Sequence, residues 1–196
     1  GTPIALTITA EAGIFGAAAF LMGNIGASQL AAHTVALQIA ALAFQVPFGV
    51  GQAATIRVGF FYGSRNSDGM KRAGWTAIAV GTGFMALTAI AMIAIPKPLL
   101  AIYIDPWDPK NAVLVGFALK YIVIAAAFQL VDGMQAVAAG ALRGLQDTRV
   151  PMWMAAFAYW VPGIGMSLWL GFYTSLEGIG VWIGLATGLS VAALLL

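Results

Sequence analysis

The sequence predicts an all-α membrane protein with six membrane-crossing helices, and three observations lead to this fold class. Of the 196 residues, 61% are hydrophobic and only 8% are charged, too few charges to cover a surface that faces water. The mean hydropathy of the chain is +0.93. Proline, glycine and charged residues divide the chain into six apolar segments, each close to or above the roughly 20 residues that a helix needs to cross a bilayer.

The composition also argues against several classes of protein. The net charge is only +2 and the basic residues fall in short connections, a distribution typical of membrane orientation, so no nucleic-acid partner is expected. The chain has no cysteine, which excludes disulfides, thiolate metal sites and redox motifs. His33 is the sole histidine, so a histidine-based metal centre is not expected either, and His33 itself is expected to be a packed, neutral residue.

The six spans are expected at residues 3–23, 28–60, 73–95, 111–142, 150–172 and 178–196. The second is longer than one bilayer crossing, and Pro47 predicts a kink in it because proline removes an intrahelical hydrogen bond. In the last span, Gly180, Gly184 and Gly188 recur at every fourth position, a pattern that lets a neighbouring helix approach closely. The chain starts without Met or a signal peptide and stops inside an apolar run, so it is expected to be a fragment of a longer protein.

The distribution of basic residues predicts the orientation of the spans. The connections "RVGFFYGSRNSDGMKR" and "RGLQDTR" together carry six basic residues. The alternate connections carry Lys97 and Lys110, with Lys120 as a third at the start of the fourth span. Because cytoplasmic loops are enriched in Lys and Arg, the arginine-rich connections are expected in the cytoplasm, and both ends of the chain with them.

Asp132 lies in the middle of an apolar run, "AAAFQLVDGMQAVAAGALRG". It follows Lys120 by 12 residues and precedes Arg143 by 11, which places it near the middle of a membrane helix. A carboxylate at that depth costs at least about 3 kcal/mol. Gln129 and Gln135 stand three residues to either side and share its helix face, so this face is expected to line a cavity or to pack against polar partners.

Glu11 is the only charged residue of the first span, and Thr7 lies one helical turn before it on the same face. A salt bridge to either buried acid would need Lys120 or Arg57 to reach inward. The remaining ways to tolerate two buried acids are protonation and cation binding, and an ion-coupled transporter requires one of them. The alternative is that each acid is protonated and only makes structural hydrogen bonds.

Three further residues are candidates for the wall of a cavity. Gln38 and Gln45 are seven residues apart and continue to Gln52, which keeps them on one stripe of the second helix. Interhelical hydrogen bonds within the bundle are favoured over direct contact with a substrate for these glutamines. Met134, beside the Asp132 face, would give a drug pocket an adaptable side chain.

Four separated stretches of the chain carry a resemblance to a known family: "PIALTITAEAGIFGAAAFLMGNIGASQLAAHTVALQIAAL", "FGVGQAATIRVG", "FQLVDGMQAVAAGALRGLQDT" and "GIGVWIG". In this order and spacing they resemble the multidrug and toxic compound extrusion (MATE) family, NorM-like branch. The resemblance covers essentially the whole chain and matches the last six of the family's twelve helices. It implies that residues 1–196 are the C-terminal transmembrane lobe, one half of a MATE-type transporter, with an N-terminal six-helix lobe as partner.

The resemblance implies a function as well. Members of the family are antiporters that export organic cations and drugs, driven by Na⁺ or H⁺. The chain is accordingly expected to be a multi-pass protein of the bacterial cytoplasmic (inner) membrane, not an enzyme, with no cofactor besides this ion. The resemblance also implies that Glu11 and Asp132 bind the coupling cation, as ligands of Na⁺ if sodium is used. Phe128 stands where the family often has an aromatic hydroxyl, and "YWVPGIG" places Pro162 before the glycine rather than after it. A hydroxyl contribution is therefore not expected at Phe128, and the bend near Pro162 is expected to differ.

Three other functions remain as alternatives. A flippase of lipids or lipid-linked oligosaccharides in the same superfamily would need buried Arg or Lys to meet phosphate, and the spans contain almost none. An intramembrane enzyme would need a catalytic cluster, which one histidine, no cysteine and acids on distant helices do not provide. An ion channel would need a filter-like loop, and no such repeat is visible.

Overall fold

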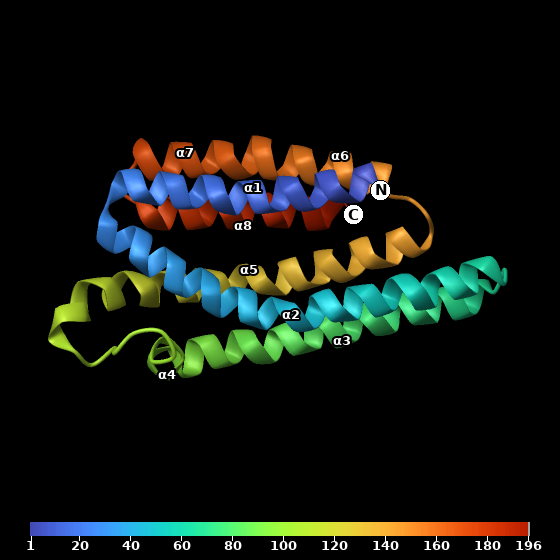
Figure 1. Cartoon of the computed structure of the whole chain (residues 1–196), viewed down its shortest axis with the longest axis horizontal. Coiled ribbons are helices and arrows are strands. Elements are labelled where there is room, and N and C mark those ends of the chain that lie inside the picture. Colours follow the sequence, from blue (N-terminus) through green and yellow to red (C-terminus); the bar gives the residue numbers. More distant parts are fainter. Residues whose placement is uncertain (196) are drawn as a thin grey trace.

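The computed structural model describes residues 1–195, and its six membrane-length spans run along its long axis (Figure 1). The first three are α1 (Thr2–Ile25), α2 (Ala27–Gly63) and α3 (Ser67–Ala94). A short helix, α4 (Pro96–Leu100), and a 3₁₀ turn, η1 (Pro109–Asn111), lead into α5 (Ala112–Gly144). The fifth span consists of α6 (Arg149–Ala158), the π-helical turn η2 (Tyr159–Gly163) and α7 (Ile164–Phe172), and the sixth is α8 (Gly178–Leu195). The predicted all-α class with six spans is confirmed.

The start of α3 differs most from the expected spans. It begins at Ser67, six residues before the apolar segment expected from position 73. The Asn66 side chain accepts a hydrogen bond from the Gly69 backbone N–H at 2.8 Å and so caps the helix, and Asp68 in the first turn suits the positive end of the helix dipole. The polar first turns of α3 are therefore helical although they carry no hydrophobic signal.

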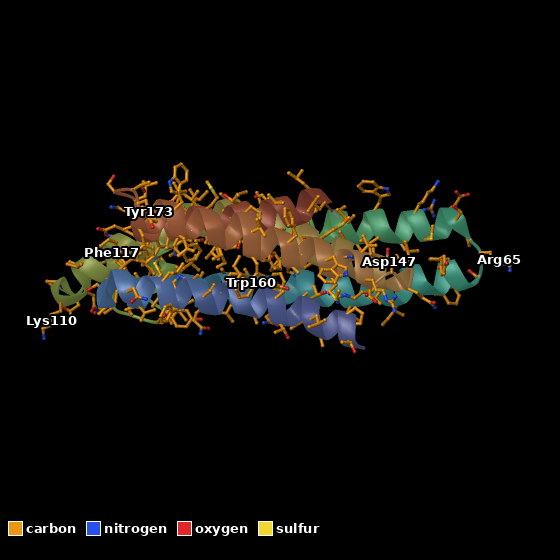
Figure 2. All side chains as sticks on the ribbon, turned by 90° about the horizontal axis from the view of Figure 1, so that it is seen from above. Arg65, Lys110, Phe117, Asp147, Trp160 and Tyr173 are labelled. Atoms are coloured by element: carbon orange, nitrogen blue, oxygen red, sulfur yellow. The ribbon has the colours of Figure 1, made fainter. Side chains whose placement is uncertain are left out.

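The helices form two layers (Figure 1). One layer contains α1, α6, α7 and α8, and the other contains α2, α3 and α5, with α5 also packing against α8. Figure 2 shows Arg65 and Asp147, from the two arginine-rich connections, toward one end of the long axis. Lys110 and Tyr173 lie toward the opposite end, while the start of α1 and the end of α8 lie toward the arginine-rich end (Figures 1 and 2).

Small residues bring α2 and α5 into backbone contact. The Thr55 hydroxyl of α2 donates a hydrogen bond to the Gly140 carbonyl of α5 at 2.7 Å. A Cβ atom at Gly51 would stand 3.0 Å from the Ala136 carbonyl oxygen, and Gly140 packs on the backbone of Gly51. This contact fixes α2 beside the Asp132 segment of α5, because Ala136 lies about one turn from Asp132.

The glycine stripe of α8 packs as the sequence predicts. Gly184 lies against Ser167 of α7, and a Cβ atom at Gly188 would stand 2.9 Å from Gly163 Cα of η2. The Ser167 hydroxyl donates to the Val181 carbonyl at 3.1 Å. The close neighbour of α8 is therefore the fifth span, and their contact holds together the layer that contains α1, α6, α7 and α8.

Pro47 and Pro162 lie in the interior of their spans, and they behave differently. The helix α2 continues through Pro47, and its ribbon changes direction near the middle of its length (Figure 1). Pro162 lies within η2, where the wider π-helical turn accommodates a residue that has no N–H to donate. This turn also places Tyr159 in the interior, where its side chain is fully buried.

Candidate functional site

Glu11 and Asp132 line the same hollow between α1, α2 and α5. Two adjoining cavities of about 300 Å³ and 210 Å³ share both acids in their walls, and we call the two together the acid cavity. Their other polar or aromatic wall residues are Thr7, Phe15, Phe44, Phe48, Gln52, Phe128, Gln129, Gln135 and Arg143. The predicted site residues Thr7, Phe128, Gln129 and Gln135 are thus brought together with the two acids.

The acid cavity lies where the two layers meet. Glu11 comes from α1 of one layer, and Asp132 comes from α5 of the other (Figure 1). Asp132 is only 7% exposed, whereas Glu11 is half-buried. A carboxylate so far from water is tolerated only when a proton or a cation offsets its charge, and the shared cavity has room for one.

The amides of Gln129 and Gln135 are anchored by their nitrogen ends. Gln129 Nε2 donates to the Met85 carbonyl at 3.2 Å and to the Thr88 hydroxyl at 2.9 Å, and Gln135 Nε2 donates to the Tyr159 hydroxyl. The Oε1 atoms of both glutamines are buried and accept no hydrogen bond from the described residues. Gln129 and Gln135 stand about one helical turn on either side of Asp132, and each lines one of the two cavities with an amide whose oxygen is free. Such oxygens can accept a proton from a carboxylic acid or bind a hard cation.

Arg143 is the wall residue that the sequence reasoning missed. That reasoning looked to Lys120 or Arg57 as an inward-reaching cation, and the structure leaves both exposed. Arg143 lines the larger cavity together with both acids. Its spacing was the available signal, because 11 helical residues return to within about 20° of the same face, so Arg143 follows Asp132 on one stripe.

Three predicted wall residues are not part of the acid cavity. Gln38 and Gln45 are exposed on α2, on the side opposite the buried residues Ile39 and Ala40. Of this glutamine stripe only Gln52 reaches the cavity. Met134 is 38% exposed, because a residue two positions from Asp132 is rotated by about 200° and points away from it.

A second buried polar cluster lies at the opposite end from Arg65, and sequence reasoning did not single it out. Gln29 Oε1 accepts hydrogen bonds from the Tyr121 hydroxyl at 2.9 Å and from the Gly178 N–H at 3.1 Å. Its Nε2 donates to the Glu177 carboxylate at 2.7 Å. We call these four residues the Gln29 cluster; it ties the start of α2 to α5 and α8.

Aromatic rings connect the Gln29 cluster to the acid cavity. Trp182 stacks on Tyr121 at 5.7 Å between ring centroids and on Phe128 at 5.6 Å. His33 is 1% exposed, lies edge-on to Trp182 at 5.5 Å, and has no hydrogen-bond partner among the described residues at either ring nitrogen. The burial of His33 agrees with the expected packed histidine. Phe128 stacks on Trp182 and lines the cavity, so its ring forms the wall between the two.

The sequence and the fold both match one family. The MatE family model matches residues 3–169 of this chain. The chain belongs to the MATE family. It is 50% identical over its full length to a probable multidrug resistance protein NorM of Mesorhizobium japonicum, and 48% identical to one of Brucella suis. A crystal structure of MATE in the bent conformation superimposes with a TM-score of 0.88 at 19% identity, covering 99% of this chain.

The chain spans 42% of the length of these relatives and of that solved structure. Its six spans are accordingly one lobe of a twelve-helix MATE transporter. As a member of this family with six membrane-length helices, the chain is part of a multi-pass membrane protein. The resemblance to the NorM-like branch is confirmed by the names and identities of the relatives.

Proposed function

We propose that this chain is the C-terminal lobe of a cation-coupled antiporter that exports organic cations and other drugs by alternating access. The names of its NorM relatives support multidrug export as the activity. Its partner in transport is then an N-terminal lobe of six helices in the same protein. We expect the end that carries Arg65 and Asp147 to lie in the cytoplasm of a bacterial cell, because its connections have the excess of Lys and Arg.

The observation that carries this proposal is that two acids from separate layers share one cavity, whose wall also contains two glutamines with free amide oxygens. Glu11, Asp132 and Arg143 are the charged residues of its described wall. With both acids ionised, the wall carries a net charge of −1, from two negative charges and one positive charge. One monovalent cation neutralises this charge, and a second would leave a buried positive charge, which is costly.

The charge count suggests how exchange works. An organic cation binds while both acids are ionised, because it supplies the missing positive charge. Na⁺ or H⁺ entering from the other side takes its place, and the drug loses its electrostatic partner. Na⁺ would be held by the Glu11 and Asp132 carboxylates and the amide oxygens of Gln129 and Gln135, whereas a proton would reside on a carboxylate and be shared with an amide oxygen. The layer interface between α1 and α5 then responds to which cation is present.

The test is drug efflux by the complete protein in proteoliposomes, with a Na⁺ gradient and a pH gradient applied separately. We expect Asp132→Asn and Glu11→Gln to lose the dependence on the driving gradient, a drop of about 5- to 150-fold if the coupling energy has the usual size. Asp105→Asn is the matched control, since Asp105 is an exposed acid outside the cavity, and it should transport normally. Normal, gradient-dependent efflux by both cavity variants would refute the proposal.

A further inference from the structure

We propose that a groove between α2 and α3 binds an anionic phospholipid, with the phosphate held by Arg57, Lys71 and Arg72. The groove has a volume of about 820 Å³ and shares no wall residue with the acid cavity. It lies at the end of the helix pair that carries Arg65 (Figure 2). This site is separate from the transport mechanism proposed above and is tested by lipid binding, not by efflux.

The charge of the groove favours an anion. Its wall contains three basic side chains and one acid, Asp68, which gives a net charge of +2. The Arg57 guanidinium lies over the Phe61 ring at 5.4 Å from the ring centre. Phe61 rests on Gly69, where a Cβ atom would stand 2.5 Å from Phe61 Cδ1. The ring thus positions the guanidinium while its N–H groups, which lie in the plane of the guanidinium, remain able to bind a phosphate.

The polarity of the groove changes along its length in the way that a phospholipid requires. Beyond the basic residues the wall becomes apolar, with Val50 and Ala53 from α2 and Ala77 and Val80 from α3. Val50 is seven residues from Arg57 and Val80 is eight from Arg72, so the apolar part extends about 10–12 Å farther into the bilayer. A free phosphate ion would use only the basic end, whereas a lipid fills both parts.

The position of the groove suits a lipid headgroup. Trp75 follows Arg72 by one helical turn and is 71% exposed. Exposed tryptophan is typical of the boundary between headgroups and hydrocarbon, so Arg72 is expected at the level of the phosphates. Basic pockets between helices on the cytoplasmic side attract anionic headgroups, while a zwitterionic lipid gains no net charge attraction there.

Lipid binding to the complete protein in neutral detergent tests this site, using phosphatidylglycerol and phosphatidylcholine and native mass spectrometry as the readout. We expect phosphatidylglycerol to bind more tightly. The triple variant Arg57→Gln, Lys71→Gln, Arg72→Gln should weaken phosphatidylglycerol binding by about fivefold for each charge removed, roughly 100-fold in total. Arg65→Gln removes a charge at the exposed tip outside the groove and should change the affinity by less than about twofold.

A second variant separates a bound lipid from a bound phosphate. Ala53→Trp fills the apolar part of the groove and leaves all three basic residues in place. We expect it to weaken phosphatidylglycerol binding and to leave the binding of soluble glycerol phosphate unchanged. Equal affinity for the two lipids, or unchanged phosphatidylglycerol binding by the triple variant, would overturn the proposal. A groove that the other lobe covers in the lipid-free protein would overturn it as well.

Discussion

Gln29 and the pair Gln129 and Gln135 are buried glutamines in helices that cross the same membrane, but their hydrogen bonding differs. Gln29 accepts two hydrogen bonds through its oxygen and donates one to a carboxylate. Gln129 and Gln135 donate through their nitrogens, and their oxygens have no donor among the described residues. A carboxylate stands between these two free oxygens in the sequence, whereas the Glu177 carboxylate beside Gln29 is exposed.

The difference separates a structural polar cluster from one that needs a further ligand. A buried polar group whose acceptor oxygen is satisfied stabilises the arrangement of helices, and its loss costs folding energy. A buried group with a free acceptor lowers stability unless something binds it. The Gln29 cluster therefore holds α2, α5 and α8 together, while we propose that the acid cavity gains and loses a cation.

The largest effect is expected for the Gln29 cluster, on the stability of the protein. Gln29→Leu leaves the Tyr121 hydroxyl and the Gly178 N–H buried without an acceptor, which should lower the free energy of unfolding of the complete protein by about 2–4 kcal/mol. Drug binding by the folded fraction should keep its dependence on Na⁺ or pH. Denaturant unfolding in detergent measures the first effect.

Gln38→Leu is the matched control for this variant, because Gln38 is an exposed glutamine of the same helix. It should change the free energy of unfolding by less than about 0.5 kcal/mol. An equal loss of stability in the two variants would remove the distinction between the Gln29 cluster and the rest of α2.

A smaller effect is expected at the acid cavity. Gln135→Met combined with Tyr159→Phe replaces both partners of one hydrogen bond by apolar groups, which should leave the free energy of unfolding within about 1 kcal/mol of the parent. The affinity for the coupling ion should fall by about tenfold, because one free oxygen beside Asp132 is lost. Isothermal titration with Na⁺, or proton uptake if protons are used, measures this affinity.

Tyr159→Phe alone retains the Gln135 amide and is the control for the double variant. It should bind the ion with nearly the parent affinity. If the double variant also binds the ion normally, the Gln135 oxygen is not a ligand. Only the Gln129 oxygen would then distinguish the acid cavity from the Gln29 cluster.

Much of the fold follows from the sequence because lipid imposes simple rules on it. Apolar length predicted the spans, and the four-residue spacing of Gly180, Gly184 and Gly188 predicted a close helix contact that the structure places against α7 and η2. The helical start of α3 was not predictable from hydrophobicity, since its first turns are polar and depend on the Asn66 cap. Local capping chemistry rather than burial decides that boundary.

The part of the candidate site that consists of acidic residues within apolar spans was predictable from the sequence. Glu11 and Asp132 are conspicuous because lipid tolerates so few acids, and the structure places both in one cavity. Gln38 and Gln45 are polar too, but which face of α2 turns inward depends on how α5 packs against it. The free oxygens of the cavity glutamines depend on partners in α3 and η2, and a single stretch of sequence does not reveal such partners.

The most direct test of the central claim is equilibrium binding of one fluorescent organic cation to the purified complete protein, measured with and without Na⁺ at two pH values. If one cavity with a net charge of −1 serves both cations, Na⁺ or protons should weaken drug binding competitively. The double variant Glu11→Gln, Asp132→Asn should lose that dependence. Drug binding that is independent of both ions, or an unchanged competition in the double variant, would contradict a shared site at Glu11 and Asp132.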